Sequence, residues 1–309
     1  MKKSWKISVI GAGAVGATLS QRILDSGIAD VVMVDILKNI VCGKALDMLD
    51  ASPITKSERG IMGTDNYKDI ESSDIVVITA GFPRKPGMTR EELISKNAGI
   101  VKEISKNIKN YAPGSIVIVV TNPLDTMTYA SYKATGFKKE KVFGMAGVLD
   151  GARLACLLAE ELKVRRSDVE TFVLGSHGDT MVPVISKTRV KGKSVINLLP
   201  KEKLDGIVKR ARDRGAEIVG LLGSGSAYYS PSAAAFRMVS AIVNDTKEVL
   251  AVSAYLNGEY ALKDLYIGVP CRIGSAGIEK IIELELSEEE REALNRSAEA
   301  IKSSIAFLS

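Results

Sequence analysis

The sequence predicts an α/β protein in which a doubly wound parallel sheet is followed by a second, α+β half. Short β-branched runs alternate with longer helical patterns through the first half of the 309 residues, as in parallel strands joined by crossover helices. The run 75–78, Ile-Val-Val-Ile, is apolar throughout, so helices must cover both faces of such a strand. A glycine-rich turn between the first strand and the first helix also favours this fold class.

The individual elements can be placed from these patterns. We expect strands at 7–10, 31–34, 60–63, 75–79, 116–120 and 142–143, and helices at 15–25, 39–51, 90–111 and 125–134. Beyond these, a meander-like stretch at 249–284 suggests antiparallel pairing, and Ser287 with Glu290 forms a capping-box pattern before a last helix. The pattern changes near residue 147, so we expect one domain at 1–146 and a second at 147–309.

Composition and charge exclude several classes of function. The chain is 46% hydrophobic and 26% charged, without repeats or biased segments, as in ordinary globular proteins. Its net charge is +5, but the basic residues are dispersed among acids, so we expect no nucleic-acid partner. No stretch approaches the roughly 20 apolar residues of a membrane span, and no signal-peptide core follows Met1. We therefore expect a cytoplasmic protein without a membrane partner.

The three cysteines do not form a recognisable site. Cys42, Cys156 and Cys271 are widely spaced, and none belongs to a C-x-x-C pair or lies beside the single histidine. We expect small buried side chains, no disulfide and no metal.

The glycine-rich turn predicts a dinucleotide site. Gly11, Gly13 and Gly16 form G-x-G-x-x-G between a strand and a helix, where they allow a tight turn, a close approach to a pyrophosphate and close helix packing. Asp35 ends the second strand and can accept hydrogen bonds from ribose hydroxyls. It is followed by Ile36 rather than arginine, so NAD is favoured over NADP. The alternative is a glycine turn that binds no nucleotide.

The only histidine, His177, is the candidate acid and base. It lies in Gly-Ser-His-Gly-Asp, residues 175–179, directly after a strand-like run. Its ordinary pKa near ~6.5 suits reversible proton transfer at neutral pH, although a lone histidine is often only a satisfied polar group.

At this point the chain resembles the malate/lactate dehydrogenase superfamily along essentially its whole length, and most closely the branch that acts on malate. Five segments carry the resemblance, namely residues 11–16, 81–90 (Gly-Phe-Pro-Arg-Lys-Pro-Gly-Met-Thr-Arg), 121–125 (Thr-Asn-Pro-Leu-Asp), 149–153 (Leu-Asp-Gly-Ala-Arg) and 175–179. The resemblance implies a Rossmann domain, an NAD cofactor and reversible hydride transfer with a 2-hydroxy acid.

Roles for the polar residues follow from the resemblance. It implies that His177 exchanges the proton, that Asp150 holds its other ring nitrogen, and that Arg153 clamps the substrate's C1 carboxylate. Asn122, before a proline bond that is often cis in the family, would bind the reacting oxygen. Without the resemblance, Asp150 would be interpreted as a helix N-cap and Asn122 as a residue that favours a turn.

The segment 81–90 would be a lid, with Arg90 polarising the substrate carbonyl. Arg84 predicts malate over lactate, because lactate enzymes usually carry glutamine there. A solvated basic loop is the alternative for this segment. Ala155 stands where enzymes activated by fructose 1,6-bisphosphate carry a basic residue, so we do not expect that effector.

The complete prediction is reversible, NAD-dependent oxidation of (S)-malate to oxaloacetate by a homodimer or homotetramer. A lactate or broad 2-hydroxy-acid dehydrogenase and a non-catalytic NAD sensor are the alternatives. The predicted cofactor contacts are Gly11, Gly13, Ala14, Val15, Gly16, Asp35, Thr79, Ala80, Gly81, Asn97, Val120 and Asn122.

Overall fold

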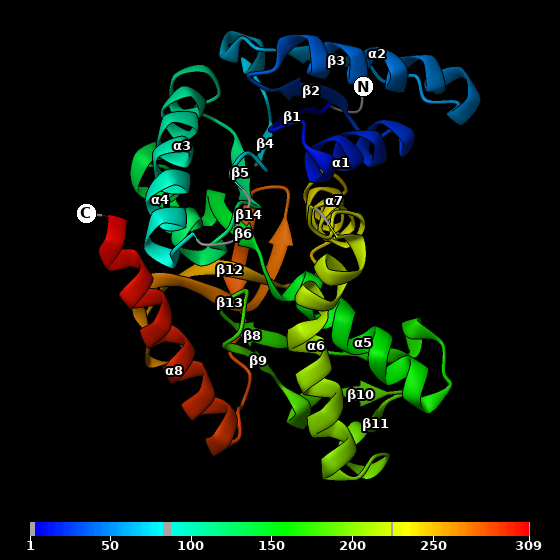
Figure 1. Ribbon diagram of the computed structural model, residues 1–309, viewed down its shortest axis with the longest axis vertical. Coiled ribbons are helices and arrows are strands. Elements are labelled where there is room, and N and C mark those ends of the chain that lie inside the picture. Colours follow the sequence, from blue (N-terminus) through cyan, green and yellow to red (C-terminus); the bar gives the residue numbers. More distant parts are fainter. Residues whose placement is uncertain (1–3, 83–87, 224, 309) are drawn as a thin grey trace.

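The structure, a computed structural model, describes residues 4–82, 88–223 and 225–308. The first half (Figure 1) contains strands β1 (Lys6–Ile10), β2 (Asp30–Val34), β3 (Ile61–Thr64), β4 (Ile75–Ile78), β5 (Ile116–Val119) and β6 (Val142–Met145), and helices α1 (Ala14–Asp25), α2 (Lys38–Thr55), α3 (Arg90–Tyr111) and α4 (Leu124–Thr135). These strands lie in the order β3-β2-β1-β4-β5-β6, each parallel to its neighbours. The predicted doubly wound sheet is confirmed, with element ends shifted by only a few residues.

Helix α2 differs most from the prediction. It was expected to end at residue 51, but it continues through Pro53 to Thr55 and ends before Lys56, whose φ is +59°. Pro53 lies in the last turn, where it removes one backbone N–H from the hydrogen bonds of the helix.

Alternation along β4 shows why its sequence is apolar throughout. Ile75 and Val77 belong to the core cluster that includes α1, whereas Val76 and Ile78 belong to the cluster that includes α3 and α4. All four side chains are fully buried. In Figure 1, α3 and α4 lie to the left of the sheet and α1 to its right, so helices cover both faces as a parallel strand requires.

The second half mixes helices with mainly antiparallel strands. It contains α5 (Gly147–Leu162), β7 (Val169–Glu170), β8 (Val173–Gly175), β9 (Met181–Pro183), β10 (Arg189–Val190), β11 (Lys193–Ser194), α6 (Lys201–Leu222), α7 (Tyr229–Val243), β12 (Val249–Asn257), β13 (Lys263–Gly274), β14 (Gly277–Ile281) and α8 (Glu288–Ile305). The predicted meander is confirmed, because β13 pairs antiparallel with β12 and β14. The capping box of Ser287 and Glu290 is confirmed at the start of α8.

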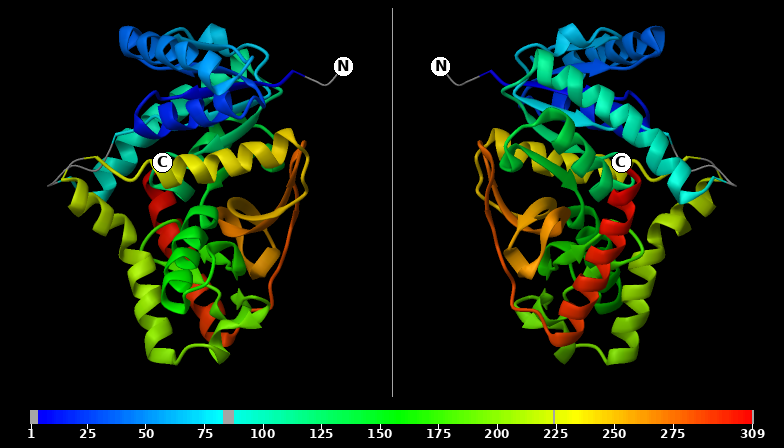
Figure 2. Two further views of the ribbon diagram at one scale, coloured as in Figure 1. Left: turned by 90° about the vertical axis from the view of Figure 1, so that its right-hand side faces the viewer. Right: turned by 90° about the vertical axis from the view of Figure 1, so that its left-hand side faces the viewer.

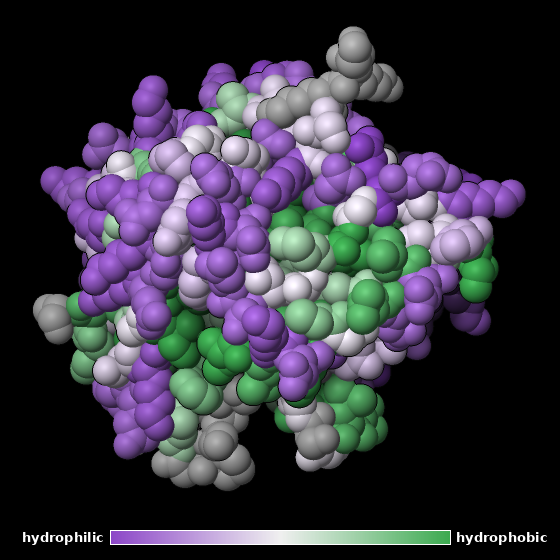
Figure 3. All heavy atoms as spheres, turned by 90° about the horizontal axis from the view of Figure 1, so that it is seen from above, coloured by the Kyte–Doolittle hydropathy of each residue, from purple (hydrophilic) through white to green (hydrophobic). Residues whose placement is uncertain are grey.

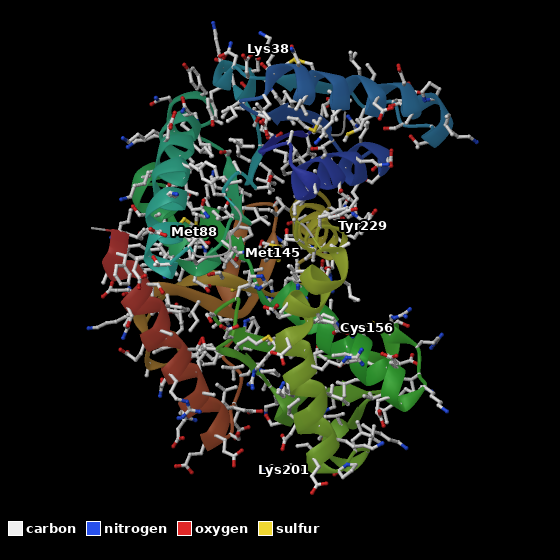
Figure 4. The ribbon with its side chains drawn as sticks, in the orientation of Figure 1. Lys38, Met88, Met145, Cys156, Lys201 and Tyr229 are labelled. Carbon is white, nitrogen blue, oxygen red and sulfur yellow. The ribbon has the colours of Figure 1, made fainter. Side chains whose placement is uncertain are left out.

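The two halves share one continuous sheet, which the sequence did not indicate. Strand β6 pairs antiparallel with β12 through Met145 and Val252, so that 11 strands of the described chain form a single sheet. Met145 lies in the middle of the molecule in Figure 4, and α5 begins two residues later. Figure 2 shows α7 lying crosswise between the upper and lower halves. Within the described residues, no helix has the length and apolar character needed to cross a membrane.

Candidate active site

The predicted cofactor residues meet at one edge of the parallel sheet. Gly11 follows β1, Asp35 follows β2, Thr79 follows β4 and Val120 follows β5. These strands are neighbours in the order β2-β1-β4-β5, so their carboxyl ends lie side by side. Ligands of open α/β sheets bind at this edge.

The three glycines of the turn have different physical reasons to be glycine. Gly11 has φ +101°, and a Cβ there would lie 2.6 Å from the backbone nitrogen of Ala80. A Cβ on Gly16 would collide with the carbonyl oxygen of Gly11, whereas a Cβ on Gly13 would have no atom of the described residues within 4 Å, its chain neighbours apart. Packing within the protein therefore requires Gly11 and Gly16. Gly13 instead leaves open space before the first residues of α1, Ala14 and Val15, where backbone N–H groups can receive a phosphate.

Asp35 is held beside this turn by the backbone. Its Oδ2 accepts a hydrogen bond of 2.7 Å from the N–H of Ala12, and its Oδ1 accepts one of 3.0 Å from the N–H of Leu37. A carboxylate has about four lone-pair sites, so capacity remains for ribose hydroxyls. Ile36 is 90% exposed and brings no positive charge for a 2′-phosphate. The arrangement fits NAD.

Asn97 ties two loops together through its amide. It is 1% exposed; its Oδ1 accepts a hydrogen bond of 2.8 Å from the N–H of Phe82, and its Nδ2 donates to the carbonyl oxygens of Phe82 at 3.2 Å and of Asn122 at 2.7 Å. A Cβ on the adjacent Gly81 would lie 2.6 Å from a methyl carbon of Thr121. Asn97 thus fixes backbone around the site, while its contact with a cofactor stays a prediction. The Asn122–Pro123 bond is cis.

His177, Asp150 and Arg153 come together although the histidine is distant in sequence. Oδ2 of Asp150 lies 2.8 Å from Nδ1 of His177, and Oδ1 lies 3.4 Å from Nη1 of Arg153. Asp150 is 2% exposed and lies in the first turn of α5, whose positive end favours a carboxylate. The N-cap of α5 is Ala146, so the interpretation of Asp150 as an N-cap is wrong.

Opposing effects set the protonation of this cluster. Burial lowers the pKa of His177, but the charge and hydrogen bond of Asp150 together raise it by more. The positive charge of Arg153 lowers this pKa, and the negative charge of Asp125 raises it. The net pKa of His177 is therefore raised above 6.5. Burial also lowers the pKa of Arg153, with a second lowering contribution from Arg214 and an opposing one from Asp150.

A cavity of about 280 Å³ is lined by His177 and Asn122, and also by Leu93 from the first turn of α3 and Ile301 from α8. A larger cavity of about 610 Å³ lies near Asp74, at the edge where the strands begin. Because open α/β sheets bind ligands where their strands end, the smaller cavity is the candidate site.

The predicted lid is only partly described. Arg84 lies outside the described residues, and for Arg90 only the backbone is described, as the first residue of α3. Thr89 caps this helix in a capping box with Glu92, with both hydrogen bonds at 3.1 Å. The pattern Thr-x-x-Glu is visible in the sequence and could have predicted this helix start.

Sequence reasoning missed a second carboxylate beside the histidine. Asp125 is 4% exposed, and its Oδ2 accepts a hydrogen bond of 3.0 Å from the backbone N–H of His177. In the sequence, Asp125 stands out only as the last residue of the segment 121–125. Its pairing with a loop 52 positions away depends on how α4 and β8 pack, which the sequence alone does not reveal.

Comparisons with known proteins find two matching family domains in this chain. Residues 5–144 match the lactate/malate dehydrogenase NAD binding domain, and residues 147–308 match the lactate/malate dehydrogenase alpha/beta C-terminal domain. Malate dehydrogenase of Bacillus subtilis is 52% identical over 98% of both chains. The structure of malate dehydrogenase from Picrophilus torridus is 45% identical with a TM-score of 0.96, covering 99% of this chain and 98% of its own.

Lactate dehydrogenase from Cryptosporidium parvum, solved with lactic acid and NAD, is 38% identical with the same TM-score of 0.96 and covers 100% of this chain and 99% of its own. The backbone fold is therefore common to enzymes named for either substrate. From its motifs, its site geometry and both matching domains, this chain belongs to the lactate/malate dehydrogenase family.

Proposed function

We propose that this chain interconverts (S)-malate and oxaloacetate with NAD, and that His177 carries the proton. It is an NAD-dependent oxidoreductase of the lactate/malate dehydrogenase family. The observation that carries the proposed role is the 2.8 Å contact between Asp150 and Nδ1 of His177, on a loop that lines the cavity. With Nδ1 engaged, Nε2 is the ring nitrogen left for the substrate.

In the proposed oxidation, Nε2 of His177 accepts the proton of the C2 hydroxyl. NAD+, which the turn at residues 11–16 and Asp35 would hold, would supply the acceptor for the hydride that leaves C2 of malate. The imidazolium that forms is stabilised by the buried Asp150 carboxylate, which also keeps the proton on Nδ1 of the neutral ring. In the reverse direction His177 returns its proton to the ketone oxygen.

Arg153 and Asn122 are proposed to orient the substrate. The Nε of Arg153 is buried and has no hydrogen-bond partner among the described residues, and a planar guanidinium matches a carboxylate through two parallel hydrogen bonds. A substrate C1 carboxylate would satisfy this donor. Asn122 lines the cavity with His177, where its amide can bind the C2 oxygen.

The choice of malate is proposed to depend on Arg84, while Arg90 is proposed to polarise the substrate carbonyl. Malate carries a second carboxylate, which a cation on the segment 81–90 would neutralise. Facing the methyl group of lactate, the same cation would be desolvated without a partner. The names of relatives that are 51–52% identical to this chain, both malate dehydrogenase, also favour malate.

Steady-state kinetics with oxaloacetate and with pyruvate, each with NADH and NADPH, tests the proposal. We expect the highest kcat/KM for oxaloacetate with NADH. Equal or better use of pyruvate would support a broad 2-hydroxy-acid dehydrogenase, and absence of NADH oxidation with every 2-oxo acid would support an NAD sensor. The variant His177→Asn should lose about 10²- to 10⁴-fold in turnover and still bind NADH.

We also propose that the chain forms a homodimer or homotetramer. Helix α2 carries exposed apolar side chains, with Leu46 62% exposed, Leu49 42% and Ile54 83%. Figure 3, which looks down on this end of the molecule, shows hydrophobic side chains gathered on the right-hand part of the face. A patch of this kind is typical of a protein interface. Analytical ultracentrifugation of the parent and of Leu46→Lys would test the assembly, and a parent that stays monomeric would contradict it.

The cytoplasm is the proposed compartment. The three cysteines are free, Cys271 buried and the other two half-buried, and unpaired thiols suit a reducing environment. The expectation of full burial is thus correct for Cys271 and wrong for Cys42 and Cys156. Cell fractionation with an antibody to the chain would test the location.

A further inference from the structure

Asp125 connects the histidine loop to two other elements. It lies in the first turn of α4 and is 4% exposed. Its Oδ2 accepts the 3.0 Å hydrogen bond from the N–H of His177, and its Oδ1 accepts one of 2.6 Å from Oγ of Ser253 on β12. One buried carboxylate thus links α4, β12 and the loop after β8, and it does so at the backbone of the only histidine in the chain.

A second, neutral contact holds the same loop from the other side. Oγ of Ser297 on α8 accepts a hydrogen bond of 2.8 Å from the N–H of Ser176 and lies 3.1 Å from Oγ1 of Thr180. Ser297 is fully buried. A neutral serine hydroxyl can therefore hold the backbone of this loop. Holding the loop in place does not by itself require a charged residue at position 125.

Burial disfavours the ionised form of Asp125. Burial raises its pKa to about 6, although the hydrogen bonds from Ser253 and His177 oppose the rise. A buried carboxylate that ionises near neutral pH must be matched by nearby positive charge. Among the residues that the structure describes, the charged groups that face His177 are Asp150 and Arg153 from α5 and Asp125 from α4, and those that face Asp125 are His177 and Asp150.

The charges of these four groups sum to zero only when the histidine ring is protonated; Arg214, which also acts on Arg153, pairs with Glu217. Arg153 and a protonated His177 supply two positive charges, and Asp150 and Asp125 supply two negative ones. Without Asp125, the protonated ring would share a single carboxylate with Arg153, which already contacts Asp150 at 3.4 Å.

We propose that Asp125 is a positioning residue for proton transfer, which holds the backbone of His177 and supplies the second negative charge that favours its protonated ring. The proposal rests on the proton-carrying role proposed above for His177. It predicts a change in the titration of His177 that a merely structural contact would not produce.

The single histidine allows a direct measurement. We would label the full-length enzyme with 13C at histidine Cε1, saturate it with NADH and follow His177 by NMR between pH 5 and 9. Asp125→Asn keeps an oxygen that can accept from the N–H of His177 but removes the charge. In this variant we expect the titration midpoint of His177 to fall by about one pH unit. We also expect the titration curve of His177 to narrow toward a single step, because the carboxylate of Asp125 no longer titrates with it.

Ser297→Ala is the matched control, because it removes a buried contact to the same loop without changing any charge. We expect it to lower turnover several-fold while the midpoint of His177 stays within about 0.2 pH units of the parent. The pH at which kcat/KM for oxaloacetate falls should follow the NMR midpoint in both variants.

A midpoint in Asp125→Asn within about 0.2 pH units of the parent would overturn the proposal. If Asp125→Asn does not fold, Ser253→Ala provides the second test, because it removes a hydrogen bond that favours the ionised form of Asp125. It should lower the midpoint of His177 by less than Asp125→Asn would. An unchanged midpoint in Ser253→Ala would also overturn the proposal. Failure of the proposed function is distinguishable, because it would appear as near-parental turnover in His177→Asn.

Discussion

Asp150 contacts both His177 and Arg153 through separate oxygens, Oδ2 to Nδ1 of the ring at 2.8 Å and Oδ1 to Nη1 of the guanidinium at 3.4 Å. One buried carboxylate therefore joins the proposed proton carrier to the proposed substrate clamp. Removing its charge should disturb proton transfer and carboxylate binding together, whereas a residue that served only the ring would affect turnover alone.

The variant Asp150→Asn should accordingly lower kcat by about 10²-fold or more and raise KM for oxaloacetate. Asp150 raises the pKa of His177, so without it the protonated ring is lost at lower pH, and the pH at which oxaloacetate reduction fades should decrease. Steady-state kinetics from pH 5 to 9 measures both effects. Asp168→Asn, a carboxylate paired with Arg165 at the surface, is the control; equal behaviour of the two variants would contradict the assignment.

Cofactor choice should respond to Asp35 and its neighbour. Replacing Asp35 by Ser would remove the proposed acceptor for two ribose hydroxyls, at about 0.5 to 1.5 kcal/mol for each ordinary hydrogen bond. Adding Ile36→Arg places a cation where the exposed isoleucine now stands. The double variant should bind NADH more weakly and NADPH more tightly than the parent in fluorescence titrations.

Ile36→Arg alone is the control for that pair, because it keeps the carboxylate and should gain less for NADPH. A double variant that rejects NADPH as strongly as the parent would remove Asp35 from the discrimination.

Substrate choice should respond to Arg84. A charge-assisted hydrogen bond to a carboxylate contributes about 1.5 to 3 kcal/mol, so Arg84→Gln should lower kcat/KM for oxaloacetate at least about ten- to a hundredfold. Pyruvate should gain, because its methyl group no longer faces a desolvated guanidinium. Lys85→Gln, the adjacent cation, is the control. If the ratio of the two kcat/KM values in Arg84→Gln stays within a factor of about two of the parent, Arg84 does not set specificity.

Local sequence signals predicted most of the fold and the glycine turn of the expected cofactor site, whereas the expected roles of Asp150, Arg153 and Asn122 came from the family resemblance. Apolar runs such as 75–78 and the spacing of Gly11 to Gly16 depend on short-range geometry, and β4 and the turn after β1 lie where these signals placed them. Long-range pairing carried no such signal. The junction of β6 with β12 and the contact of Asp125 with the His177 loop depend on tertiary packing between distant segments.

Stability should depend on pH through Asp125 in a direction opposite to that of most carboxylates. The pKa of its folded form is about 6, whereas an aspartate in an unfolded chain titrates near 3.9. Between these values the folded state binds more protons than the unfolded state, so the free energy of unfolding falls as pH rises through this window. Two pH units correspond to at most about 3 kcal/mol.

Asp125→Asn removes this dependence, since the amide does not titrate. Relative to the parent, the variant should therefore become more stable by up to about 3 kcal/mol between pH 4 and pH 7. Carboxylates distant from Asp125 contribute equally to both proteins and cancel, and the lower midpoint expected for His177 in the variant changes the difference in the same direction. Urea unfolding at several pH values measures the difference, with Ser297→Ala as a control whose difference from the parent should not vary with pH. A parent-to-variant difference that stays constant within about 0.5 kcal/mol over this range would mean that Asp125 is not the buried acid described. If instead the variant gains stability and loses the raised midpoint of His177, the charge at Asp125 is kept for proton transfer at a cost in stability.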